Sequence, residues 1–461
     1  MLRFGLNRST DSRKADVAMT TPDFENQRRR SLFLILLAAF LINAALLFVV
    51  LPILGHFFSG RYSVDFTDLY DLIANNLVHA NGYRVEAGMS ETMMREPGYP
   101  LFLAIVFKIG GYHIEAARLA NLLLAFGAAF MIMRLTRRIT EDRIAPLLAA
   151  ILFLFYPGTL ISEARAGLEI AFMCSIMLFT LALYRAVAKG NFPAFFLAGL
   201  ALGVVILVRS TPLLFPVFLL VYLLLTANGA SERLKVVLSM AALVLGMVVV
   251  MSPWVIRNYL LVQKFVPTGT LAGHAAQEGL YACQHLSFDT DFFAVQREAG
   301  LERSQFASRL RIPFTGTYYY QYFYDARDEL ALNKSLLAGV ASEYRRHPTL
   351  LASCGGKNLF FNFWFLGKTW QATWLNMLVQ VPLLALALSG IFVLRKRGLL
   401  RQIGIMLTFV LYVPAVHAPI LADARHSMAV VPFLMILASV SLVSIWHAYR
   451  THVPKETGPG S

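Results

Sequence analysis

Three aspartates spaced three residues apart, Asp65, Asp68 and Asp71, follow the first apolar run of the chain. Residues three apart on a helix share a face, so consecutive members of this series can act together. Such carboxylates suit general-base chemistry, or the binding of a cation or a hydroxyl-rich ligand. Acids near a helix start also complement the helix dipole with no catalytic role, and taken alone the series favours that structural interpretation.

Arg95 begins a second polar group, in the stretch MMREPGYPLFLAIVF. Its guanidinium can bind a phosphate through two parallel hydrogen bonds. Pro97 and Pro100 stiffen the backbone and disfavour helix upstream of them. An ion pair between Arg95 and Glu96 or an aspartate is the structural alternative. The position of the stretch at the mouth of an apolar segment favours phosphate binding.

Further charged and polar residues occur at the ends of other apolar runs. Glu169 lies inside such a run and therefore needs a partner or a wet cavity. In SPWVIRNY, Arg257 and Asn258 follow an interfacial tryptophan, and they can hold a lipid phosphate or the headgroup layer.

Four polar residues gather in HAPILADARH, between the last two apolar runs: His417, Asp423, Arg425 and His426. No close pair of ligands four residues apart is present, so the pattern favours a polar network over a metal site. We predict no cofactor, and a divalent metal has no support.

The elements that position these residues belong to a polytopic membrane protein. Of 461 residues, 57% are hydrophobic, and they gather in runs long enough to cross a bilayer. The net charge of +14 raises nucleic acid as a partner. However, basic clusters flank the apolar runs where the positive-inside rule expects cytoplasm, so we predict membrane lipids and no nucleic acid as partners.

Ten spanning helices are predicted, the first an uncleaved anchor, at residues 31–54, 114–133, 144–157, 164–186, 192–209, 211–228, 235–254, 374–394, 402–419 and 427–447. The segment 97–110 is too short for an upright span, and we predict a re-entrant or shallow helix, or one of a short pair. Tyr62 to Tyr83 is predicted to form an interfacial amphipathic helix that Thr67 caps.

The predicted organisation has five parts: a disordered cytoplasmic tail at 1–30, a transmembrane core at 31–254 that includes an external loop at 55–113, an external loop region at 255–373, C-terminal spans at 374–447, and a cytoplasmic tail at 448–461. Cys174 lies in an apolar run and is predicted to be inert. Cys283 and Cys354 lie in the external region, where a disulfide and two free thiols are equally compatible with the sequence.

Seven motifs, taken in order, resemble those of the GT-C superfamily of membrane glycosyltransferases, which includes dolichyl-phosphate-mannose protein mannosyltransferases and lipid A aminoarabinose transferases. The motifs are DLYDLIANNLVHANGY, REPGYPLFLA, ARLANLLLAF, YPGTLISEARAGLEIAF, SPWVIRNY, EYRRHPTLLASCGGKNLFFNFW and ARHSMAVVPFL. In the last motif, His426 replaces the tyrosine of the family pattern. The resemblance implies an all-α, GT-C-like bundle of about 10–12 transmembrane helices with interfacial helices and a helical external loop.

The resemblance also implies a function. The donor would be a sugar on polyprenyl phosphate, the acceptor a hydroxyl of a glycan, lipid or protein, and the site would face the periplasm of a bacterial inner membrane. Asp65 and Asp68 jointly match the family's catalytic base. Arg95, with Arg257 or Arg425, would bind the donor phosphate. The supporting residues would be Asp71, Glu96, Glu169, Asn258, His417, Asp423 and His426.

Two other functions fit the same sequence. A lipid-linked sugar flippase or transporter would carry charges at the midplane of the membrane. A polymerase or ligase of lipid-linked glycans would share the outward-facing site but transfer an oligosaccharide.

Overall fold

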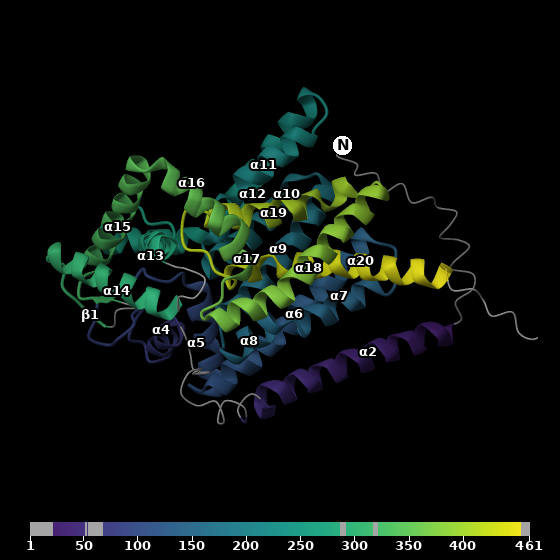
Figure 1. The fold of residues 1–461 in the computed structure, drawn as a ribbon, viewed down its shortest axis with the longest axis horizontal. Helices are drawn as coiled ribbons and strands as arrows, with labels where there is room; N and C mark the ends of the chain where they lie inside the picture. Colours follow the sequence, from purple (N-terminus) through teal and green to yellow (C-terminus); the bar gives the residue numbers. More distant parts are fainter. Residues whose placement is uncertain (1–21, 51–52, 54–67, 286–291, 317–320, 453–461) are drawn as a thin grey trace, which may run out of the picture.

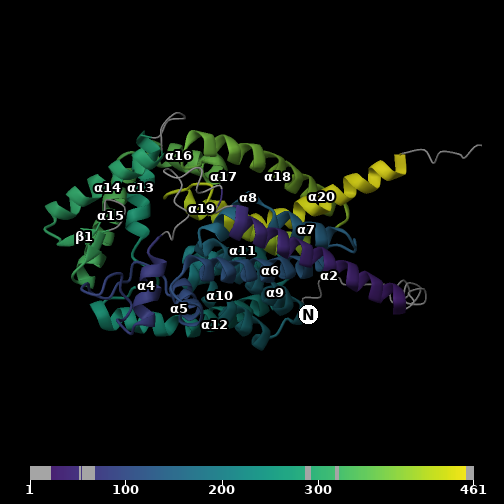
Figure 2. The ribbon, with the colours of Figure 1, turned by 90° about the horizontal axis from the view of Figure 1, so that it is seen from below.

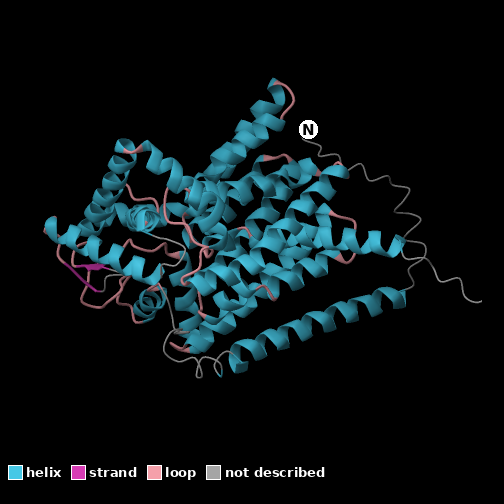
Figure 3. Cartoon of the chain, viewed as in Figure 1, coloured by secondary structure: helices cyan, strands magenta, loops and turns pink. Residues whose placement is uncertain are grey.

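The computed structural model of the protein describes residues 22–50, 53, 68–285, 292–316 and 321–452. These residues are predominantly helical (Figure 3), as predicted. One short antiparallel pair interrupts the helices, in which β1 (Phe314–Gly316) lies beside β2 (Gln321–Phe323) and Phe314 is opposite Phe323.

Seven helical segments of the described residues are long and apolar enough to cross a membrane. They are Arg30–Val50, formed by α2 (Pro22–Ala45) and the π-helix η1 (Leu46–Val50), then α6 (Ile114–Ile139), α9 (Leu168–Lys189), α12 (Ala230–Val262), α18 (Trp370–Lys396), α19 (Leu400–His417) and α20 (Val431–His452). Two further apolar helices, α7 (Ala145–Leu154) and α8 (Pro157–Ala164), meet at a bend of 47° and are together long enough for a broken span or a re-entrant loop. Three apolar segments are shorter, namely α5 (Gly98–Gly110), α10 (Phe192–Val208) and Thr211–Thr226, which contains the 3-10 helix η2 (Thr211–Leu214) and α11 (Phe215–Thr226).

Each of the ten predicted spans corresponds to one of these helices, and α5 has the short length expected for 97–110. The helices run alongside one another in one bundle (Figure 1). Glycines permit the closest approach between α10 and α12, where a Cβ on Gly199 would lie 2.0 Å from the Leu243 carbonyl oxygen. Small residues at such contacts are how helices associate in a membrane.

The α12 helix is longer than predicted. It continues past Pro253 to Val262, whereas the sequence predicts that the span ends at residue 254. Trp254 and Val262 are buried there, against Tyr83 and Met93 respectively. This packing offsets the cost of a proline inside the helix. Arg257 and Asn258 therefore lie on a helix rather than in an exit loop.

The described residues between 263 and 369, called the connecting domain below, lie at one end of the bundle, together with α4 (Tyr70–Val78) (Figures 1 and 2). Besides the β pair, the domain contains α13 (Ala272–His285), α14 (Phe292–Arg309), α15 (Ala326–Arg346), α16 (Pro348–Lys357), the π-helix η3 (Asn358–Asn362) and α17 (Phe363–Phe365). The apolar clusters of this domain are small, as expected for a domain that packs against the bundle.

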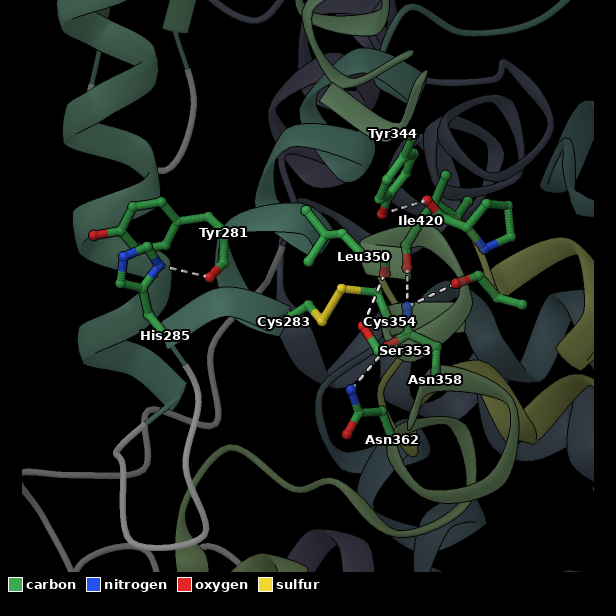
Figure 4. Close-up of a disulfide and its surroundings, with 12 residues drawn as sticks. Tyr281, Cys283, His285, Tyr344, Leu350, Ser353, Cys354, Asn358, Asn362 and Ile420 are labelled. Atoms are coloured by element: carbon green, nitrogen blue, oxygen red, sulfur yellow. Dashed lines mark hydrogen bonds between the residues drawn. A yellow bond between two sulfur atoms is a disulfide. The ribbon is translucent and has the colours of Figure 1, made fainter. Parts of the chain in front are cut away.

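A disulfide between Cys283 and Cys354 joins α13 to α16 (Figure 4), which decides between the two alternatives left by the sequence. Nearby, the Asn358 side chain donates hydrogen bonds to the carbonyls of Ala418 and Ile420, at 2.9 and 2.7 Å. The disulfide-linked part of the connecting domain therefore fixes the position of the loop after α19. Cys174 is a free cysteine on α9.

Candidate functional site

The chain is unwound between α8 and α9, and other helices satisfy the exposed backbone. Ala166 there adopts a φ of 49°, which is rare for a residue other than glycine. Three side chains from α5 and α6 donate hydrogen bonds to the carbonyls of the break: Arg118 to Ala164 at 2.7 Å, Tyr99 to Ala166, and Asn121 to Gly167 at 2.9 Å. Irregular backbone at membrane depth requires such partners. The break places Glu169 in the first turn of α9, where it is 5% exposed.

Asp68 lies just before α4, and the backbone around it is also unusual. Its φ is 73°, and that of the next residue, Leu69, is 69°. The Asp68 carboxylate contacts two guanidinium groups. Its Oδ1 lies 3.5 Å from Nη2 of Arg95, and its Oδ2 lies 2.8 Å from Nη1 of Arg425. Strained backbone held in place by charged contacts is frequent at functional sites.

Arg425 extends the contact to a second acid, because its Nε lies 3.3 Å from Oε1 of Glu169. Arg95, Asp68, Arg425 and Glu169 are called the charge cluster below. Its side chains are 11%, 14%, 39% and 6% exposed, in that order. The cluster is therefore largely shielded from water, and ionic contacts are strong in such an environment. It is open to solvent at Arg425.

The Tyr70 ring packs against Arg95, and the Tyr99 ring packs against Tyr70. The guanidinium carbon is 4.8 Å from the centre of the Tyr70 ring, and the Tyr70 ring meets Tyr99 edge to face at 5.4 Å. Burial raises the pKa of Tyr70 to about 12, so its phenol stays protonated at neutral pH. The cation and the ring attract one another, which limits the positions that Arg95 can adopt.

Behind Arg425, a buried network fixes the loop between α19 and α20. The Asp423 carboxylate lies 3.1 Å from Nζ of Lys368 and 2.9 Å from Nδ1 of His426, and it accepts a hydrogen bond from the Arg425 backbone N–H at 3.0 Å. Burial alone would raise the pKa of Asp423, but Lys368 and His426 hold it well below its usual range. The His417 ring is 4.3 Å from that of His426, and its Nδ1 lies 3.1 Å from the Leu421 carbonyl.

This arrangement is a buried polar network. Among the described residues, no group of three acidic, histidine or cysteine side chains is arranged to hold a metal ion. Lys368 is a member that the sequence analysis missed. It precedes Thr369, the N-cap of α18, and so resembles an ordinary basic residue flanking a span. Only the fold brings it to Asp423.

Two acids predicted to be supporting residues, Asp71 and Glu96, have partners outside the charge cluster. Asp68 and Asp71 do not share a helix face, because α4 begins at Tyr70 and Asp68 precedes it with a left-handed backbone. Asp71 instead accepts a hydrogen bond from Tyr112 at 2.6 Å, and burial raises its pKa. Glu96 accepts one from the backbone N–H of Ser210 at 3.3 Å.

Arg257 also has partners of its own. It pairs with Glu91 at 3.0 Å, donates to the Thr92 carbonyl at 2.9 Å and stacks 4.8 Å from the Trp254 ring centre. Asn258 is buried and donates to the Val266 carbonyl at 3.0 Å. Of the two arginines that the sequence offers as companions of Arg95, Arg425 is therefore the one that shares its carboxylate.

Asp65 and the predicted cap Thr67 lie outside the described residues, and the cap position of α4 is occupied by Leu69, which makes no side-chain cap.

A bent helix pair, a short α5 and a charge cluster at one end of the bundle characterise this helical membrane protein. Residues 95–256, about a third of the chain, match the family described as dolichyl-phosphate-mannose-protein mannosyltransferase. No curated protein matches the sequence.

Among solved structures, the chain resembles the oligosaccharyltransferase AglB from Archaeoglobus fulgidus. The TM-score is 0.54 at 14% identity, covering 92% of this chain and 52% of AglB, so the chain spans about half the length of that relative. It also matches ArnT from Cupriavidus metallidurans at 16% identity, covering 81% and 72% of the two chains, with a TM-score of 0.32.

Proposed function

We propose that this protein is a membrane glycosyltransferase that moves a sugar from a polyprenyl-phosphate donor to a hydroxyl group of a glycan, lipid or protein. One observation carries the proposal: Arg95 and Arg425 converge on a single carboxylate at the mouth of the bundle. Two guanidinium groups this close, in a site shielded from water, suit a phosphate that gains charge as it leaves.

The reaction forms one bond and breaks one. The oxygen of the acceptor hydroxyl attacks the anomeric carbon of the sugar, and the bond from that carbon to the phosphate oxygen breaks. Polyprenyl phosphate leaves with the bonding electrons. Arg95 and Arg425 stabilise its negative charge, and an aspartate takes the hydroxyl proton.

Asp68 is one candidate for that base, since its carboxylate lies between the two arginines. In the absence of donor it neutralises both guanidinium groups. A bound phosphate would compete for them and leave the carboxylate available to the acceptor hydroxyl. Asp65 is the other candidate and lies outside the described residues.

The proposed orientation of the site in the membrane rests on the distribution of charged residues at the helix ends. The α9 helix carries Glu169 of the charge cluster in its first turn and Lys189 in its last. Basic residues also end α6 and α18, namely Arg137, Arg138, Arg395 and Lys396. By the positive-inside rule, those ends face the cytoplasm. The charge cluster then faces outward, toward the periplasm if the membrane is a bacterial inner membrane.

The fold supports the donor class. The AglB structure is described as a complex with an inhibitory peptide and a dolichol-phosphate, and the family match names a dolichyl-phosphate sugar. By analogy, we propose a polyprenyl phosphate as the carrier in this protein.

The test uses the purified protein in detergent, radiolabelled polyprenyl-phosphate sugars and acceptor extracts. Release of free polyprenyl phosphate together with a labelled acceptor would support the proposal, and Arg425→Ala should slow that release by about 10²–10³. No release from any donor would contradict it. Donor recovered chemically unchanged in the opposite leaflet of proteoliposomes would point to a flippase instead.

A further inference from the structure

Residues 90–96, called the arginine segment below, end in Arg95 and Glu96 and are held from both sides. From the bundle, Arg257 on α12 donates to the Thr92 carbonyl at 2.9 Å. From the connecting domain, the Thr270 backbone N–H donates to the Met93 carbonyl at 3.0 Å. The segment has no regular secondary structure up to Glu96, so these contacts fix its path.

The centre of this grip is Glu329 on α15, a carboxylate only 2% exposed. It accepts a hydrogen bond from Thr92 Oγ1 at 2.6 Å, another from the Met93 backbone N–H at 3.1 Å, and a third from Thr270 Oγ1. Two of its three partners belong to the arginine segment. Thr270 in turn bonds the same segment through its backbone.

The contacts continue toward Arg95. Thr92 Oγ1, which donates to Glu329, accepts a hydrogen bond from the Met94 backbone N–H at 2.9 Å. The Tyr83 hydroxyl lies 3.0 Å from the Arg95 carbonyl oxygen and 3.1 Å from that of Glu96. The backbone of the arginine segment, from the contacts with Glu329 to Arg95, is thus hydrogen-bonded at nearly every residue.

A buried carboxylate is a costly way to obtain stability alone. Removing such a charge from water costs several kcal/mol, and the hydrogen bonds of its partners do no more than offset that cost. An apolar side chain of similar volume packs a helix face equally well. The hydrogen bonds made by Glu329 have a direction that an apolar side chain lacks. They determine where the segment lies relative to α15.

We propose that Glu329 is a positioning residue through which the connecting domain sets the place of the Arg95 guanidinium at the donor phosphate. The inference rests on the proposed function, and it adds a residue of the connecting domain to the donor site. It also gives Arg257 a positioning role on the other side of the segment.

Two measurements on purified protein in detergent test the inference. The first is hydrogen exchange of the peptide covering 90–97. The second is binding of undecaprenyl phosphate. In Glu329→Gln we expect faster exchange in that peptide, with α15 still protected, and affinity lower by about tenfold. Asp328→Asn, the same change one position earlier on α15, is the matched control and should alter neither.

A double-mutant cycle separates positioning from general stability. If Glu329 acts through Arg95, Glu329→Gln should cost no further affinity once Arg95 is alanine. Thr92→Val, which removes one partner from the other side, should repeat the effect in weaker form and serves if Glu329→Gln fails to fold. Unchanged exchange in 90–97, or fully additive losses, would overturn the positioning role. A wild-type protein that binds no undecaprenyl phosphate would instead overturn the proposed function.

Discussion

Asp68 and Arg425 are 357 positions apart in the chain, yet Oδ2 of the aspartate lies 2.8 Å from Nη1 of the arginine. The contact joins the loop before α4 to the loop before α20. Arg95 binds the other oxygen of the same carboxylate, and Glu169 binds the same arginine. Displacement of the Asp68 carboxylate by another anion would therefore affect every member of the charge cluster.

Asp68→Asn should change turnover and donor affinity in opposite directions. If Asp68 is the base, turnover falls by about two orders of magnitude or more. The neutral amide no longer competes for the arginines, so undecaprenyl phosphate should bind more tightly. Turnover assays and ligand binding on the same preparation check both effects.

The comparison variants are Asp65→Asn, for the second candidate base, and Asp142→Asn, whose carboxylate pairs with His447. Near-normal turnover in Asp68→Asn with loss in Asp65→Asn would assign the base to Asp65. Asp142→Asn should behave as the wild type.

The three arginines should separate into two classes. Arg95→Ala and Arg425→Ala remove charges expected at the leaving phosphate and should lower kcat/KM by about 10²–10³. Arg257→Ala removes contacts to Glu91 and Thr92 and should lower the melting temperature as well as activity.

Steady-state kinetics and thermal unfolding on the same samples distinguish the classes, with Arg327→Ala, an exposed position on α15, as the control. Equal kinetic losses for all three arginines without any change in melting temperature would contradict the division.

Two buried glutamates near the α8–α9 break should respond differently to the same isosteric change. Glu169 pairs with Arg425, so Glu169→Gln should reduce activity by weakening the hold on that arginine. Glu163 is fully buried, and neither carboxylate oxygen has a hydrogen-bond partner among the described residues. Glu163→Gln should therefore leave the melting temperature unchanged or raise it, since it removes an ionisable group from an apolar site. A large loss of stability in Glu163→Gln would show that this acid has a partner.

Acid should weaken the connecting domain through His274. Burial, with help from Arg303, lowers the pKa of this histidine from 6.5 to about 3. The unfolded chain then binds a proton that the folded chain does not, so stability is full above pH 6.5 and falls as the pH drops toward 3. Between pH 6.5 and 5 the loss is about 2 kcal/mol.

Thermal unfolding at several pH values measures this loss. His274→Phe should flatten the profile, whereas His347→Gln, at an exposed histidine that ends α15, should not. A profile that keeps its slope in His274→Phe would assign the acid sensitivity to other groups.

The sequence by itself determined the membrane class, the helical segments of the bundle and the short α5, because long apolar runs have few other stable environments. It also supplied Asp68, Arg95, Glu169, Asp423, Arg425 and His426 as residues of interest, since charged groups at the edges of apolar runs are costly without a role.

Only the tertiary structure decided how those residues pair. Backbone angles at Asp68 and Ala166, which no residue type announces, turn the side chains toward or away from one another. The continuation of α12 past Pro253 moves Arg257 to the arginine segment, because packing outweighs local preference. Lys368 and Glu329 join through contacts distant in sequence, and Cys283 meets Cys354 across 71 positions. A linear sequence states which charges need partners, whereas their distances depend on how the helices pack.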